Sequence, residues 1–169
     1  MTTIIDHVHG STPPWILRSS AEPSGLVASF NNVKIPGNLA VRLLDGSLMA
    51  NINELFAVFA EAFDFPDYFG NNSSAFSECM TDLSWLPASG YVAVISNSEE
   101  LLKREPSEVS WLIESLRRIS EAWSVPITVG ESWDRPARPF HFILMHKPQD
   151  IGQLQLELLR LPLIPELSR

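Results

Sequence analysis

The sequence predicts a small α/β domain with a mostly parallel sheet of three or more strands and helices packed around it. Two observations carry this prediction. Continuous apolar runs bounded by turn residues, such as residues 90–95, are typical of strands buried on both faces. Between them lie segments whose apolar residues recur every three to four positions, as in amphipathic helices. The order from residue 41 is strand, helix, helix, strand, helix, strand, strand, and such alternation favours a parallel sheet.

The first strand of this domain is expected over residues 40–44 and the first helix over residues 52–63. Asn51, followed three residues later by Glu54, forms a capping-box pattern at the start of the helix. Pro66 limits its end, because the residue before a proline avoids the helical conformation. The apolar residues of the segment follow helical spacing: Leu55, Phe56, Phe59, Ala62 and Phe63.

A second helix is expected at about residues 74–84, after a loop over residues 67–72. Asn72 or Ser73 can cap its first turn. One stripe of the helix is apolar and would face the core: Ala75, Phe76, Cys79, Met80 and Leu83. The opposite face is polar and would meet solvent: Ser74, Ser77, Glu78, Thr81 and Asp82.

The rest of the domain is expected to hold strands over residues 90–95, 125–129 and 140–145. A third helix opens at Pro106, with a core stripe of Val109, Leu112, Ile113, Leu116, Ile119 and Trp123. The tail contains a short helix over residues 150–161, broken at Pro162.

The first forty residues differ in composition, being rich in Ser, Pro, Gly and Asn. We expect an extension with one or two short strands, formed by the apolar pieces at 15–17 and 26–30. The predicted organisation is therefore an extension over 1–40, a domain over 41–147 and a tail over 148–169.

The acidic charge of the chain is concentrated in its middle third. The formal net charge is −8, and residues 41–100 alone carry nine acidic residues against one basic residue, Arg42. The segments on either side are neutral. Phosphate binding needs clustered Lys and Arg, so nucleic acid is not expected as the direct ligand. An acidic surface favours a basic partner, although it also serves solubility.

The residues argue against several other functions. No run of about 18 apolar residues is present, so no membrane span is expected. The start of the chain lacks a basic region, and Cys79 is the single cysteine, which together favour the cytoplasm. We find no nucleophile–base pair, phosphate-binding glycine loop or metal-ligand pattern among the four histidines. We therefore expect a protein that is not an enzyme and that holds no metal or cofactor.

One stretch of the chain is distinctive. Leu44-Asp45-Gly46 precedes the capped helix, and Phe65-Pro66-Asp67-Tyr68-Phe69-Gly70-Asn71-Asn72 leads into the next helix, which carries Ala75, Phe76 and Cys79. This pattern resembles the barstar family, whose members inhibit barnase-type ribonucleases. The resemblance is specific over residues 65–80 and extends over roughly 41–130.

The resemblance implies a bacterial, cytoplasmic inhibitor or immunity protein for a basic extracellular-type ribonuclease or nuclease toxin. The loop and second helix would plug the active site of the nuclease, with acidic side chains in place of RNA phosphates. The partner-binding residues that it implies are Tyr68, Gly70, Asn72, Ser74, Ser77, Glu78 and Asp82.

Two of these positions depart from the family pattern. Glu78 falls where the family has its central aspartate, but Ser74 and Ser77 stand where it has a second aspartate and a contact tryptophan. The family has a further acidic contact on the later helix. In this sequence Glu114 and Glu121 lie only near the matching position and not at it. Ser74 and Ser77 reduce the negative charge of the face that inhibition needs. The alternative is therefore a non-inhibitory protein-interaction or regulatory module on the same fold.

Overall fold

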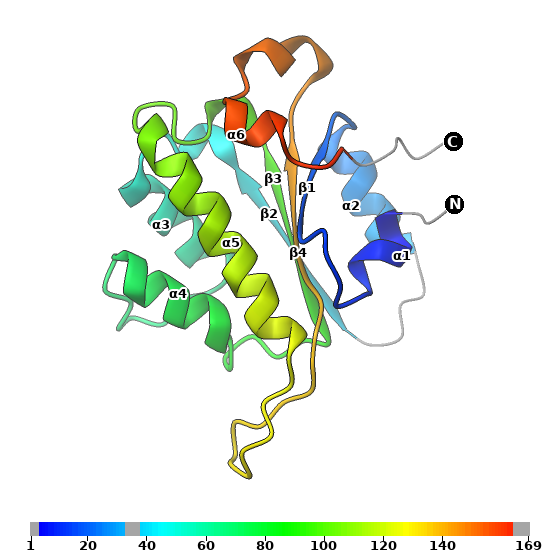
Figure 1. The fold of residues 1–169 in the computed structure, drawn as a ribbon, viewed down its shortest axis with the longest axis vertical. Helices are drawn as coiled ribbons and strands as arrows, with labels where there is room; N and C mark the ends of the chain where they lie inside the picture. Colours follow the sequence, from blue (N-terminus) through cyan, green and yellow to red (C-terminus); the bar gives the residue numbers. More distant parts are fainter. Residues whose placement is uncertain (1–3, 33–37, 164–169) are drawn as a thin grey trace.

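Four parallel strands form the sheet of this computed structural model, which describes residues 4–32 and 38–163 (Figure 1). The spatial order is β1-β4-β3-β2, and their bounds are β1 Ile16–Ser19, β2 Leu39–Asp45, β3 Gly90–Ser96 and β4 Phe140–Met145. Each neighbouring pair is parallel, for example Val94 with Ile143. The predicted α/β class with a parallel sheet is confirmed.

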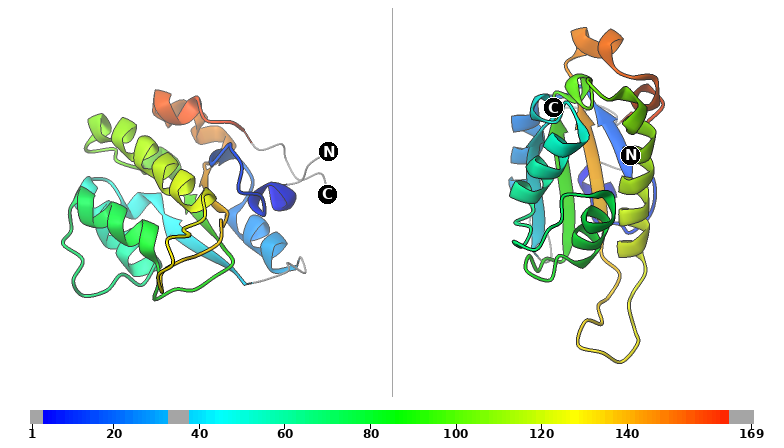
Figure 2. Two further views of the ribbon diagram at one scale, coloured as in Figure 1. Left: turned by 60° about the horizontal axis from the view of Figure 1, so that its bottom comes forward. Right: turned by 90° about the vertical axis from the view of Figure 1, so that its left-hand side faces the viewer.

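Helices cover both faces of the sheet (Figure 2, left view). One face carries α3 Ile52–Ala62, α4 Ser73–Asp82 and α5 Val109–Ser124, close to the three predicted ranges. Short 3₁₀ helices lie at Gly46–Leu48, Ser98–Glu100, Pro106–Glu108 and Pro148–Gln153. Because β3 is covered on both sides, its alternating side chains enter two different cores, with Tyr91 in one and Val92 in the other.

The other face of the sheet is covered by α1 Ile4–Val8 and α2 Pro23–Asn32, and β1 lies between them in the chain. The strand expected at residues 15–17 is confirmed by β1, which pairs with β4 and so joins the sheet. The strand expected around residues 26–30 is instead part of α2. Leu26 and Phe30 are four residues apart, so both lie on the same side of that helix and are buried together. Residues 1–3 and 33–37 lie outside the described part.

The strand expected over residues 125–129 is not formed. A single antiparallel bridge joins Ile127 to Arg135, while Val125 and Val129 are exposed. Pro126 has no N–H to give to a strand neighbour, which works against pairing at this point. The segment is instead the first arm of a long loop over residues 125–139 between α5 and β4.

The tail folds back onto the edge of the sheet. The short helix expected there is present in part as α6 Leu156–Leu159, after the 3₁₀ turn at Pro148–Gln153. Beyond it the backbone N–H of Arg18 donates to the carbonyl of Pro162 (2.8 Å), and Leu163 forms a bridge with Arg18. Among the described helices, none combines the length and apolar character needed to cross a membrane.

Candidate functional site

The loop between α3 and α4 is anchored by aromatic side chains. Phe69 packs against Phe65 at a ring-centroid distance of 4.9 Å and against Phe56 of α3 at 6.1 Å. The backbone N–H of Phe69 also donates to the carbonyl of Pro66 (2.9 Å). With Phe69 held on the core, the neighbouring Tyr68 projects outward and is 73% exposed. A large exposed ring on an anchored loop is a ready contact for another protein.

The junction of the loop with α4 is built by Asn72. Its Oδ1 accepts the backbone N–H of Ala75 (2.9 Å), and its Nδ2 donates to the carbonyl of Gly70 (3.2 Å). A Cβ at Gly70 would lie 3.0 Å from that Nδ2, so the glycine permits this close approach. The left-handed conformation is taken by Asn71 (φ 50°) and not by Gly70. Gly70 and Asn72, which the family resemblance names as contact positions, thus also shape the loop.

Glu78 and Asp82 lie one turn apart on the exposed side of α4. Desolvation first, and then the electrostatic influence of Cys79, Asp82 and Glu78, raise the pKa of Tyr68. The phenol therefore keeps its proton and can donate a hydrogen bond. Tyr68, Glu78 and Asp82 form one surface, which we call the acidic face.

Cys79 points to the opposite side of the helix and is only 3% exposed. Burial first, and then the charges of Asp82 and Glu78, raise the pKa of its thiol. A protonated, buried thiol is a packing group and a poor nucleophile. The structure thus places this side chain in the apolar stripe that the sequence predicts.

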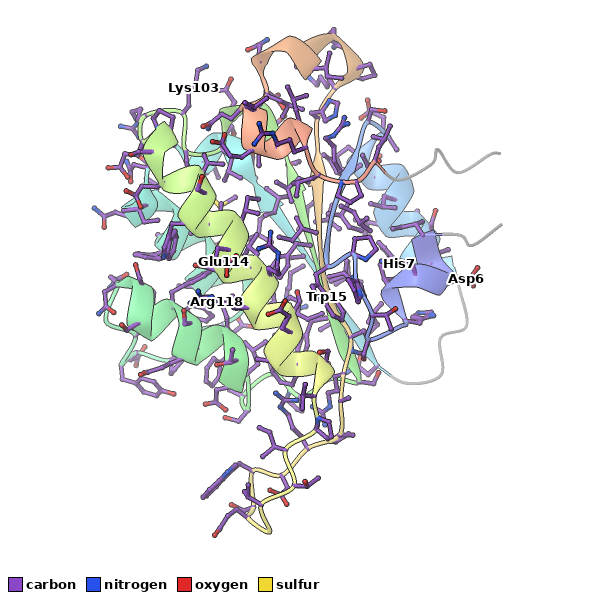
Figure 3. All side chains as sticks on the ribbon, viewed as in Figure 1. Asp6, His7, Trp15, Lys103, Glu114 and Arg118 are labelled. Atoms are coloured by element: carbon purple, nitrogen blue, oxygen red, sulfur yellow. The ribbon has the colours of Figure 1, made fainter. Side chains whose placement is uncertain are left out.

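Ser74 and Ser77 border the acidic face, since Ser74 lies one helical turn from Glu78 on the same exposed side of α4. With Thr81 they form the α4 side of a groove of about 500 Å³, whose α5 side is formed by Glu114, Arg118 and their neighbours. Figure 3 shows Glu114 and Arg118 where α5 faces α4. The groove is therefore rich in hydroxyl groups and carries a cation as well as an anion.

Arg118 is the residue of this groove that the sequence reasoning missed. Its Nε donates to Oε1 of Glu114 (2.9 Å), and Arg117 pairs with the same carboxylate. The side chain of Arg118 is 74% exposed, so its guanidinium remains accessible to a partner. The signal was present, because Glu and Arg four residues apart on a helix face the same way. Arg118 thus brings a positive charge into the groove beside Ser74 and Ser77.

The chain belongs to the Barstar family, because the family model described as Barstar (barnase inhibitor) matches residues 39–144. The matched range holds β2 to β4 and helices α3 to α5. The segment that forms α1, β1 and α2, and the tail with α6, lie almost wholly outside it. The acidic face and the groove lie inside the matched range.

Comparison with solved structures shows a wider likeness of fold. The chain is similar to a protein in the structure of Drosophila ORC bound to DNA, with a TM-score of 0.52 and 14% identity. The alignment covers 88% of this chain and 36% of that chain, so the protein spans about a third of the length of this structural relative. No curated protein matches the chain.

Proposed function

We propose that this protein acts in the cytoplasm as an inhibitor or immunity protein that binds a basic ribonuclease or nuclease toxin. The acidic face would enter the active site of the nuclease, with Glu78 and Asp82 opposite the cations that bind RNA phosphates. The observation that carries the proposal is the joint exposure of Tyr68, Glu78 and Asp82 on one surface of a Barstar-family domain. Blocking the active site in this way needs no catalytic group of the inhibitor.

The local structure supports tight binding by such a face. Phe69 and the Asn72 cap hold the loop in place before a partner arrives, so little conformational entropy is lost on association. Attraction between these carboxylates and a positive cleft also accelerates encounter. Salt weakens this attraction, because at 0.1 M ionic strength charges more than about 10 Å apart are largely screened from each other. Association should therefore be fast and should slow as salt is added.

The test is an inhibition titration. Cleavage of a fluorescent RNA by barnase and by other basic microbial ribonucleases is measured with increasing amounts of the protein. For each enzyme that is inhibited, Glu78→Ala and Tyr68→Ala should weaken inhibition by about 30-fold to 1000-fold, the range of dominant interface residues. Glu22→Ala is the matched control, because Glu22 is an exposed acid at the start of α2, on the other face of the sheet.

The variants also separate the proposed site from a general charge effect. If Glu22→Ala weakens inhibition as much as Glu78→Ala does, the acidic face is not the contact surface. If no ribonuclease in the panel is inhibited by the unmodified protein, inhibition is refuted for this class of enzyme.

The second candidate is a non-inhibitory interaction or regulatory module. Ser74, Ser77 and Arg118 favour it, because they replace negative charge by hydroxyl groups and a cation close to the acidic face. A domain that binds a ribonuclease in calorimetry without slowing RNA cleavage would support this alternative.

A further inference from the structure

The loop over residues 125–139 joins the end of α5 to the start of β4. It lies at the same end of the molecule as the last turn of α4 (Figure 1). Figure 1 shows it as the yellow segment at the bottom of the molecule, and the right view of Figure 2 shows it projecting from the body. Loops of this length without secondary structure are uncommon in compact domains and usually serve a function. The base of the loop contacts the segment that follows α4, where Pro87 and Ala88 adjoin Pro136 and Ala137.

The outer part of the loop exposes large apolar side chains. Trp133 is 62% exposed, and Val129 and Val125 are similarly open. Among the described residues, Tyr68 and Trp133 are the two exposed aromatic side chains of this kind. Tryptophan and tyrosine are the residues that most often dominate the energy of protein interfaces.

The loop is held in one shape by its own polar groups. The carboxylate of Asp134 accepts the backbone N–H of Val129 (3.0 Å) and that of Gly130 (2.8 Å). These bonds lower the pKa of Asp134, so the clamp stays charged near neutral pH. Nearer the base of the loop, two backbone hydrogen bonds join Ile127 to Arg135. Trp133 is thus presented on an ordered loop, which reduces the entropy lost when it binds.

The base of the loop is joined to α4 through the half-buried Arg135 and the buried Trp123. The guanidinium of Arg135 stacks 3.9 Å from the ring centroid of Trp123 and donates to the carbonyl of Ala122 (3.0 Å). Trp123 in turn donates from Nε1 to the carbonyl of Met80 in α4 (2.8 Å). The loop and the helix that carries the acidic face are therefore fixed relative to each other.

We propose that the loop over residues 125–139 is a second contact arm for the nuclease that the acidic face binds. Trp133 is its anchor, and it enters an apolar pocket on the nuclease beside the active-site cleft. This inference rests on the proposed function. Beyond the positive cleft that the acidic face needs, the partner must also carry an apolar pocket for Trp133.

Charge favours the nuclease over a second copy of this chain as the occupant. Glu131 is exposed close to Trp133, and the acidic face on α4, to which the base of the loop is tied through Trp123, adds Glu78 and Asp82. Two copies meeting through this end would bring like charges together, which is unfavourable. A basic protein instead gains attraction from the acidic face and from Glu131 and Asp134 in the outer part of the loop. The cations of the loop, Arg135 and Arg138, are half-buried at its base.

The experiment is the same inhibition titration, with barnase and the other basic microbial ribonucleases as probes. Trp133→Ala should raise the inhibition constant at least tenfold and Trp133→Phe much less, since a large ring remains. Asp134→Ala should also weaken inhibition, because Trp133 is kept but the loop loses its clamp. Leu48→Ala is the matched control, since Leu48 is equally exposed in the 3₁₀ turn after β2, and it should change inhibition less than twofold.

The outcomes distinguish this inference from the proposed function. Inhibition that is lost in Glu78→Ala but unchanged in Trp133→Ala would overturn the second arm and leave the proposed function standing. If the unmodified protein inhibits none of the enzymes, both are overturned. If sedimentation shows a dimer that Trp133→Ala dissociates while inhibition is unchanged, the loop serves self-association and the inference is wrong. Thermal unfolding of Trp133→Ala should match the unmodified protein, and weaker inhibition explained by unfolding would also count against it.

Discussion

Replacing Asn72 by alanine tests whether the start of α4 positions the acidic face. The substitution removes the acceptor for the N–H of Ala75 and the donor to the carbonyl of Gly70. Asn51 at the start of α3 provides a matched control. Its backbone angles are almost the same (φ −141°, ψ 171° against φ −140°, ψ 168°), and its Oδ1 accepts the N–H of Glu54 at the same 2.9 Å.

The expected destabilisation follows from these bonds. Loss of an asparagine N-cap costs about 1 kcal/mol, within a range of about 0.5–2 kcal/mol. The bond from Asn72 to Gly70 is exposed, so it adds about 0.5 kcal/mol at most. Both variants should therefore lose about 1–1.5 kcal/mol, or about 2–5 °C in melting temperature for a domain of this size.

Binding should separate the two variants although stability does not. Asn72→Ala frees the loop that carries Tyr68 and should weaken nuclease inhibition about tenfold, whereas Asn51→Ala should leave it unchanged. Urea unfolding measures the stability and the RNA-cleavage titration measures inhibition. Equal loss of inhibition in the two variants would refute the argument, because it would trace the effect to global stability and not to the loop.

Three further predictions concern the fold. Burial lowers the pKa of His141 from 6.5 to about 4, so the unfolded chain binds more protons between these values and stability falls as the pH drops. From pH 7 to pH 5 the protein should lose about 2 kcal/mol more than a His141→Gln variant in urea unfolding. Leu17→Ala should cost about 2–4 kcal/mol in the same assay, because this side chain of β1 is buried under α2; a cost below about 1 kcal/mol would show that the first segment is dispensable. Arg135→Ala should speed amide hydrogen exchange in the loop over residues 125–139, and unchanged exchange would show that stacking on Trp123 does not hold it.

The sequence predicts the parts of this fold whose signals are local. Helical spacing identified α3, α4 and α5. The predicted cap Asn51 is confirmed by its hydrogen bond, and of the two candidates Asn72 and Ser73 it is Asn72 that caps α4. Continuous apolar runs identified β3 and β4. These signals suffice because each lies within one helix or strand.

The short strand expected at residues 15–17 is confirmed by β1, but its place in the sheet was not predicted. That place is fixed by pairing with β4, more than a hundred residues later in the chain. The strand expected at residues 125–129 failed for the converse reason, since its β-branched residues found no partner strand. Local propensity for strands depends strongly on such context.

The candidate site shows the same difference between local signals, which the sequence reveals, and distant contacts, which it does not. The polar face of α4 was visible in the sequence, because its residues follow helical spacing. Arg118 becomes part of the surface only through the packing of α5 against α4. The exposure of Trp133 is equally invisible in the sequence, since it depends on a loop shape that Asp134 fixes.

The packing of α4 explains how this surface can change while the fold is kept. Its attachment to the core depends on Phe76, Cys79 and Met80, all buried, and on the bond from Trp123 to the carbonyl of Met80. The residues of its outer side make few contacts with the core, so their replacement costs little stability. Serine at positions 74 and 77 is therefore compatible with the same helix position. Under the proposed function, changes confined to these outer side chains would alter which nuclease fits while the fold is kept.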